Sequence, residues 1–225
     1  MMEILIPIFT LAFLFLTLIG VFYIAKAARK RVDDNFKELG QRLSLNFHAA
    51  DPNYWKRISN LSNPSLSGII SGYPITVTVS IRGSGKSKVQ YIVFDMDLPT
   101  NHQNHLKIFH ELFFQKIGKK LGLQKDVDIN DEEFDRLYIV KTDSAGFARS
   151  ILSDKILKEK LIDNYRLMNY AAISFEHDRI HFEAINTFYY KKEVAKLEEL
   201  IRMSLLFAKK LQQIDNKHFD DGSFS

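Results

Sequence analysis

Aspartate and histidine residues are the groups of this sequence whose spacing could support acid–base chemistry. Asp95 and Asp97 stand two residues apart in an apolar run that predicts a strand, so both carboxylates lie on one face and could form an acid/base pair. His177 and His181 flank a predicted hairpin turn and could approach each other. Nothing else in the sequence identifies a substrate, and we interpret the two histidines as surface or packing residues.

A glycine-rich segment, GSGKS at 83–87, resembles a phosphate-binding loop, in which backbone amides and a lysine hold phosphate groups. The complete motif needs a glycine at position 80, where this chain has Ser80, and a helix afterwards, where this chain predicts a strand. We therefore expect a hairpin turn, because Gly83 and Gly85 can adopt the positive φ that tight turns require.

A zinc site is not predicted from the histidines of residues 102–110. His110 and Glu111 begin a zinc-protease-like pattern, but Phe114 occupies the position of the second metal ligand. His105 and His110 are five residues apart, a spacing that does not place both on one helical face. The cluster therefore carries no metal prediction.

The first three ligand positions of a calcium-binding loop are matched by Asp126, Asp128 and Asn130, but the later positions of the motif are not. Asp131 replaces the required glycine, and Leu137 stands where the bidentate glutamate belongs. We interpret the segment as a solvated acidic turn. The sequence thus assigns no metal, no cofactor and no catalytic residue.

Composition limits the classes of protein that this chain can be. Its 225 residues are 46% hydrophobic and 26% charged, which suits one ordinary domain with an appendage and excludes a disordered or collagen-like chain. There is no cysteine, so disulfides, thiolate nucleophiles and iron–sulfur ligation are excluded. The net charge is +4, but Lys26, Arg29, Lys30 and Arg31 supply four cations, and residues 32–225 hold 27 basic and 26 acidic residues. This balance gives little support for nucleic-acid binding.

Residues 4–25 contain no charge and are rich in Leu, Ile and Phe, which predicts a transmembrane helix that would contact the bilayer directly. The alternatives are a buried core helix or a cleaved signal peptide; the apolar run is too long for the latter, and the chain begins Met1, Met2, Glu3 without a basic residue. The four basic residues at 26–31 predict that the N-terminus faces outward and that the rest of the chain is cytoplasmic at the inner (plasma) membrane, as a single-pass protein.

Residues 26–45 predict a short helical stalk, because Val32, Phe36, Leu39 and Leu43 recur at helical spacing. Gly40 interrupts the pattern, which is too short to argue a coiled coil, so self-association through the stalk, as a homo-oligomer, is left open. We favour packing of this stripe onto the following domain.

Residues 46–215 predict an α+β domain with one mainly antiparallel sheet packed with amphipathic helices, and residues 216–225 a flexible tail. The predicted helices and strands follow from hydrophobic periodicity and from N-cap and turn residues. Strands are expected at 66–71, 75–81, 88–98, 127–129, 137–141, 171–176 and 179–185. Helices are expected at 52–61, 103–121, 143–164 with a break near Ser153, and 193–214.

One family resemblance is carried by residues 66–160. Gly68-x-x-x-Gly72 leads into a strand, Glu133-Phe134-Asp135 precedes the apolar run 137–140, and an Asp143-Ser-Ala segment and Ile151-Leu152 follow. The pattern resembles uncharacterised bacterial membrane-anchored proteins, although Leu137 stands where that pattern has phenylalanine. The resemblance implies the architecture and a bacterial source, and it brings no catalytic residues.

The sequence is compatible with two candidate functions. The preferred one is a membrane-tethered cytoplasmic interaction module with a membrane or cytoplasmic protein partner, which needs no catalytic constellation. The alternative is a membrane-associated, hydrolase-like enzyme with a site assembled from dispersed histidines and carboxylates. A pocket that gathers His177 or His181 with Asp95 or Asp97 would favour the enzyme, whereas an exposed apolar groove along the last helix would favour the module.

Overall fold

The computed structural model describes residues 2–50, 63–83, 88–99, 104–110, 125–169, 171–185 and 192–221. The chain is an α+β protein with a single antiparallel sheet, as predicted. Its strands are ordered β1-β2-β3-β4-β9-β8-β5-β7-β6. The predicted helix at 52–61 lies outside the described residues.

The first half of the sheet is a meander of neighbouring strands. It comprises β1 (Asn46–His48), β2 (Ser65–Ile70), β3 (Tyr73–Arg82) and β4 (Val89–Asp97). The other half begins with the hairpin of β8 (Ala171–Glu176) and β9 (Arg179–Ile185), followed by β5 (Leu106–His110), β7 (Tyr138–Thr142) and β6 (Lys125–Asp126). The halves join where β4 pairs with β9, so residues far apart in sequence become neighbours.

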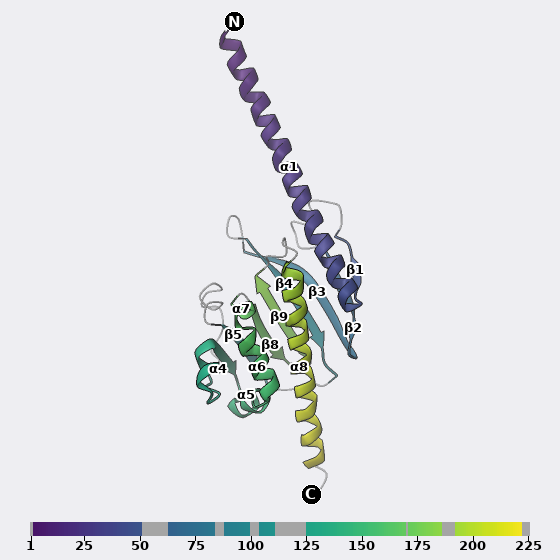
Figure 1. Cartoon of the computed structure of the whole chain (residues 1–225), viewed down its shortest axis with the longest axis vertical. Coiled ribbons are helices and arrows are strands. Elements are labelled where there is room, and N and C mark those ends of the chain that lie inside the picture. Colours follow the sequence, from purple (N-terminus) through teal and green to yellow (C-terminus); the bar gives the residue numbers. More distant parts are fainter. Residues whose placement is uncertain are drawn as a thin grey trace.

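Helices pack on one face of this sheet (Figure 1). They are α4 (Glu132–Leu137), α5 (Ala145–Leu152), α6 (Lys155–Asp163), α7 (Tyr165–Met168) and α8 (Lys192–Asp221). Alternate strand residues such as Ile92, Phe94 and Phe182 face these helices and form the main core. The predicted break near Ser153 is confirmed: Ser144 caps α5 and Asp154 caps α6.

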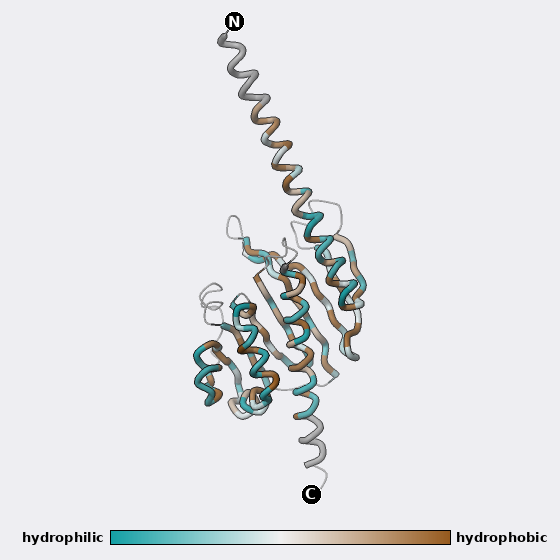
Figure 2. The backbone as a smooth tube through the Cα atoms, viewed as in Figure 1, coloured by the Kyte–Doolittle hydropathy of each residue, from teal (hydrophilic) through white to brown (hydrophobic). Residues whose placement is uncertain are grey.

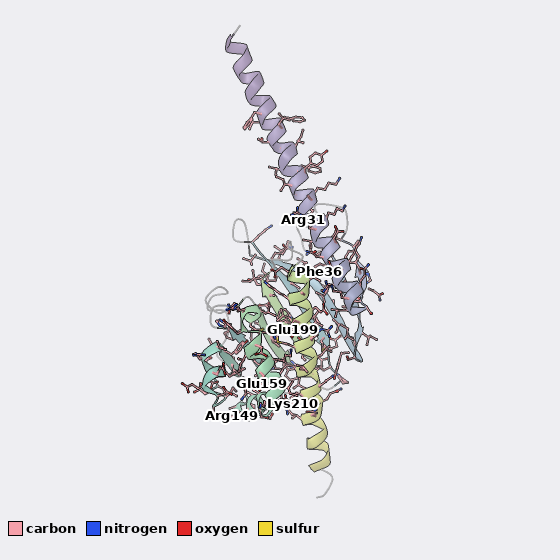
Figure 3. The ribbon with its side chains drawn as sticks, viewed as in Figure 1. Arg31, Phe36, Arg149, Glu159, Glu199 and Lys210 are labelled. Carbon is pink, nitrogen blue, oxygen red and sulfur yellow. The ribbon has the colours of Figure 1, made fainter. Side chains whose placement is uncertain are left out.

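Salt bridges link the outer surfaces of α6 and α8. The Lys160 ammonium lies 3.4 Å from the Glu199 carboxylate, and that of Lys210 lies 3.7 Å from Asp154 at the N-cap of α6. Glu199 and Lys210 are labelled along α8 in Figure 3. Because these groups are solvent-exposed or half-buried, the buried apolar face of α8 contributes more to its docking than the ion pairs do.

The expected helix at 103–121 is wrong for residues 106–110, which form β5 between β7 and β8. Leu106 and Ile108 face the helices, while Phe109 packs with Ala172 on the opposite face of the sheet. A short apolar segment with both faces buried fits a central strand, and two neighbouring strands satisfy its backbone groups. Residues 111–124 are not described.

Three other boundaries differ from the prediction. The strand expected at 127–129 is the two-residue β6 at Lys125–Asp126, although the amide of Val127 still donates to the Val140 carbonyl at 2.9 Å. The helix expected to end at Ile214 continues as α8 to Asp221, into the segment predicted as a flexible tail. A single helix, α1 (Met2–Leu43), crosses the predicted border between anchor and stalk.

The C-terminal part of α1 is docked onto the domain. Val32, Phe36 and Leu39 are buried in the main core, as the preferred interpretation of the stalk predicted, so this stripe is occupied by its own domain. Gly40 allows the close approach that ends the helix, because a Cβ there would lie 3.0 Å from the carbonyl oxygen of Leu45. Figure 3 labels Phe36 at this junction.

The N-terminal part of α1 extends away from the domain (Figures 1 and 2). Over residues 13–24 its large apolar side chains are exposed, among them Phe15, Leu18 and Phe22. By length and mean hydropathy, no helix within the described part of the chain qualifies as a membrane span.

Candidate functional site

A polar cleft of about 560 Å³ lies over the central strands, on the face of the sheet opposite the helices. Strand alternation places its residues there, because their sequence neighbours Phe94, Phe175 and Phe182 belong to the main core. Its floor and walls include charged side chains from five strands: Arg82, Asp95, Lys107, Glu176, His181 and Glu183.

One row of residues crosses this cleft. Lys107 on β5 is paired in register with Ser174 on β8, Ser174 with His181 on β9, and His181 with Asp95 on β4. Directly paired residues of antiparallel strands have their side chains on the same face and about 5 Å apart. The pairing therefore brings together residues separated by up to 86 positions in sequence.

His181 lies between two carboxylates. Its Nδ1 is 2.8 Å from Oδ1 of Asp95, and its Nε2 is 3.8 Å from Oε2 of Glu183. The hydrogen bond to Asp95, with a further contribution from Glu183, raises the pKa of His181 to about 9. The imidazole is therefore protonated at neutral pH and can donate from both ring nitrogens, which removes it as a general base there.

Glu183 is a buried carboxylate at the base of the cleft. Burial favours its neutral form, but the interaction with the nearby His181 and the charges of Arg82 and Lys107 outweigh burial and lower the pKa of Glu183. An oxygen of Glu183 lies 2.6 Å from the Arg82 guanidinium. Glu183 is therefore ionised and held among three cations.

Lys107 is the remaining cation of the row. Burial lowers the pKa of its ammonium, while the charges of Glu183 and Glu176 act in the opposite direction. No carboxylate of the described chain lies within ion-pair distance of it. Lys107 therefore contributes a partly desolvated positive charge that has no ion pair among the described residues, although the charges of Glu183 and Glu176 favour it.

The acid/base pair suggested by Asp95 and Asp97 is divided between two cations. Asp95 contacts His181, whereas Oδ1 of Asp97 accepts a hydrogen bond from Arg179 Nε at 3.0 Å. The two aspartates share a face of β4, as predicted, but only Asp95 lines the cleft. Each carboxylate is already engaged, so the pair does not form a free acid/base couple.

Of the other histidines, His177 lies at the cleft and His105 lies beside it. Their ring centroids are 4.9 Å apart, and His177 occupies the β8–β9 turn with φ 55°. His110 stacks on Tyr165 at 6.5 Å, while His102 is outside the described residues. Among described residues no group of three or more metal-ligating side chains is present.

Described residues of two rejected motifs lie at the ends of strands and helices. Gly83, with φ 95°, leaves β3 toward the β3–β4 connection of an antiparallel pair, and residues 84–87 are not described. Asp131 caps α4, its carboxylate accepting from the Phe134 amide at 3.1 Å. The same carboxylate pairs with Lys158, which gives it a structural partner.

Sequence reasoning missed Lys107, Ser174, Glu183 and Arg82. Lys107 lies in the segment that was predicted as a helix. Ser174 and Glu183 lie in predicted strands, and Arg82 is one residue beyond the strand predicted at 75–81, but the polar positions of these strands were not compared by face. A usable signal was present, since Arg179, His181 and Glu183 alternate with apolar residues at the period of a strand.

No family model matches the chain, and no curated protein matches it. Among solved structures, the crystal structure of the mycobacterial trehalose monomycolate transport factor A, TtfA, is similar, with a TM-score of 0.50 and 11% identity. The likeness covers 80% of this chain and 94% of that one. At this identity it concerns the fold alone. The resemblance to bacterial membrane-anchored proteins stays a prediction.

Proposed function

We propose that this chain is a membrane-tethered interaction module whose domain presents the polar cleft to a ligand or partner. The observation that carries the proposal is the continuity of α1, which joins exposed apolar residues at 13–24 to a segment buried in the domain core. Because Phe36 and Leu39 are fully buried, whatever holds the N-terminal part of α1 also fixes the domain.

A bilayer is the environment that suits the exposed part of α1. Phe13, Leu14, Phe15 and Leu16 are consecutive and each more than half exposed, so they surround the helix instead of forming one stripe. A partner helix would cover one stripe, whereas lipid contacts every side. The uncharged run 4–25 and the basic residues at 26–31 support a single-pass anchor with the domain on the cytoplasmic side.

The tether and its orientation are tested separately. We expect the full-length chain to remain in the membrane fraction after washing with alkaline carbonate, and release of the intact chain would contradict the anchor. An alkaline phosphatase fusion after Ser225 should be inactive if the domain is cytoplasmic. Strong phosphatase activity from a membrane-retained fusion would contradict only the orientation.

A second candidate, a membrane-associated enzyme, is favoured by one observation: the cleft gathers His177 and His181 with Asp95, the pocket that distinguishes an enzyme from a module. Ser174, His181 and Asp95 also lie in one row, as a hydrolytic triad would require. However, the Ser174 hydroxyl donates to the His181 carbonyl at 3.4 Å, and His181 is already protonated at neutral pH. The arrangement therefore supports binding better than nucleophilic hydrolysis.

The two candidates differ in their dependence on Ser174. An enzyme that uses this hydroxyl would label at Ser174 with a fluorophosphonate probe, and labelling would disappear in Ser174→Ala. We expect no labelling of the wild-type chain. Stoichiometric, Ser174-dependent labelling would establish the enzyme instead.

A further inference from the structure

Two ion pairs hold charged groups of the cleft, and Lys107 belongs to neither of them. Glu183 is paired with Arg82 at 2.6 Å, and Asp95 with His181 at 2.8 Å. With His181 protonated, the charged residues that line the cleft balance at four positive (Arg82, Lys107, Arg179 and His181) and four negative (Asp95, Glu176, Asp178 and Glu183). Among these cations, Lys107 is one for which no carboxylate of the described residues lies within ion-pair distance.

The neighbours of Lys107 include a second lysine on β7, besides Glu183 and Glu176, whose charges favour the ammonium. Lys141 on β7 is its register partner on the other side, and like charges in that position repel. The Lys141 ammonium lies 3.6 Å from Asp126, whereas Lys107 has no such carboxylate among the described residues. A partly buried ammonium without a counter-ion is costly, and an acidic group placed beside it would remove part of that cost.

Other donors of the cleft could contact the same acidic group. Arg82 uses one guanidinium nitrogen for Glu183, and its side chain is half exposed. Its remaining N–H groups lie in the plane of the guanidinium, a geometry that matches carboxylate and phosphate oxygens. The Ser174 hydroxyl is next to Lys107 in the row, and its present hydrogen bond at 3.4 Å is long.

We propose that the cleft binds a ligand through an acidic group, a carboxylate or a phosphate, that is received by the ammonium of Lys107. Arg82 and Ser174 supply further donors to the same group, and His181 serves to hold the carboxylates of Asp95 and Glu183 in place at the base. This inference rests on the proposed binding role of the domain, but it does not depend on the membrane tether.

The acidic group can belong to a free soluble acid or to a lipid headgroup, and two experimental arms distinguish these sources. In the first, the full-length chain in a neutral detergent is treated with acetic acid N-hydroxysuccinimide ester, with and without inorganic phosphate or acetate. In the second, the chain is treated in nanodiscs of phosphatidylcholine with or without phosphatidylglycerol. Mass spectrometry gives the acetylation rate of Lys107 and of Lys155, an exposed lysine on α6 that serves as internal control.

We expect a soluble anion, the anionic lipid or both to slow acetylation of Lys107 by about fivefold or more while Lys155 changes by less than twofold. Protection in the first arm alone identifies a free acid as the source, and protection in the second alone identifies a headgroup. Unchanged acetylation of Lys107 in both arms overturns the proposal. So does equal protection of Lys155, which would show a general effect of the anion on the reagent.

Direct binding provides the second measurement. NMR titration of the full-length chain with the protective anion should give a dissociation constant that rises about tenfold or more in Lys107→Met, as expected for loss of one charged hydrogen bond, and less than threefold in Lys107→Arg. An unchanged constant in a folded Lys107→Met overturns the proposal. Release of the chain by carbonate with anion binding intact would contradict the tether alone.

Discussion

The charged state of His181 makes the stability of the domain depend on pH in a defined direction. The pKa of His181 rises from 6.5 to about 9 on folding because Asp95 accepts its hydrogen bond. A folded-state pKa above the unfolded value means that the stabilisation is complete below pH 6.5 and is lost as pH rises through 9. Replacing Asp95 with Asn removes the carboxylate while retaining its shape, and should remove this pH-dependent contribution.

The size of the effect follows from the same values. One pKa unit corresponds to about 1.4 kcal/mol, so the full rise would be worth about 3 kcal/mol. The His181 side chain is 31% exposed, and solvent screening reduces the contribution. We therefore expect Asp95→Asn to lower the free energy of unfolding by about 1–2 kcal/mol at pH 6 and by much less near pH 10.

The assay is urea unfolding of the full-length chain in a neutral detergent, followed by circular dichroism at pH 6, 8 and 10. Asp97→Asn is the matched control, because its pair with Arg179 is about half exposed on both sides and should change stability by less than about 0.5 kcal/mol at each pH. A difference between wild type and Asp95→Asn that is equal at pH 6 and pH 10 would refute the reasoning. An NMR titration of His181 with a midpoint near 6.5 would do the same.

Three further substitutions test the packing, each by the urea midpoint of the full-length chain. Phe36→Ala should lower the free energy of unfolding by about 3–4 kcal/mol because the ring is fully buried, while Ile156→Ala, at an exposed position, should change it by less than about 0.5 kcal/mol; equal effects would contradict the docking of α1. Gly40→Ala should destabilise by about 1 kcal/mol, since its Cβ would press on the Leu45 carbonyl, and a gain in stability would show that this contact can relax. Tyr138→Phe should cost about 1–2 kcal/mol by leaving a buried carbonyl of α6 without its 2.6 Å hydrogen bond, and an unchanged midpoint would show that water replaces it.

The sequence predicted a helix at residues 106–110, where β5 forms, and the reason for this error lies in the pairing of the sheet. The apolar positions 106 and 109 are compatible with a helix, and the helical spacing continues to Ile117 in the sequence. In the fold, β7 and β8 provide backbone partners on both sides of residues 106–109. Local periodicity contains no information about such partners, so the tertiary pairing overrides it.

In the candidate site too, the residue types could be read from the sequence, whereas the contacts depended on tertiary strand pairing. Asp95 and His181 were singled out because of their types, but their contact required β4 to pair with β9, and the sequence does not state which strands become neighbours. Lys107 was not singled out, because its place in the cleft depends on β5 being a strand. The protonated state of His181 depends in turn on both carboxylates beside it.

By itself, the sequence determined the α+β class, the β2–β3–β4 strands, the β8–β9 hairpin, the break at Ser153 and the buried stripe of α1, because periodicity, caps and turns act within a few residues. Only the tertiary structure decided the order of the strands, the single helix that connects residues 13–24 to the core, and the position of the Lys107 ammonium in the cleft. These features arise from contacts between segments that are distant in the sequence. Their geometry is fixed when β4 pairs with β9 and joins the two halves of the sheet.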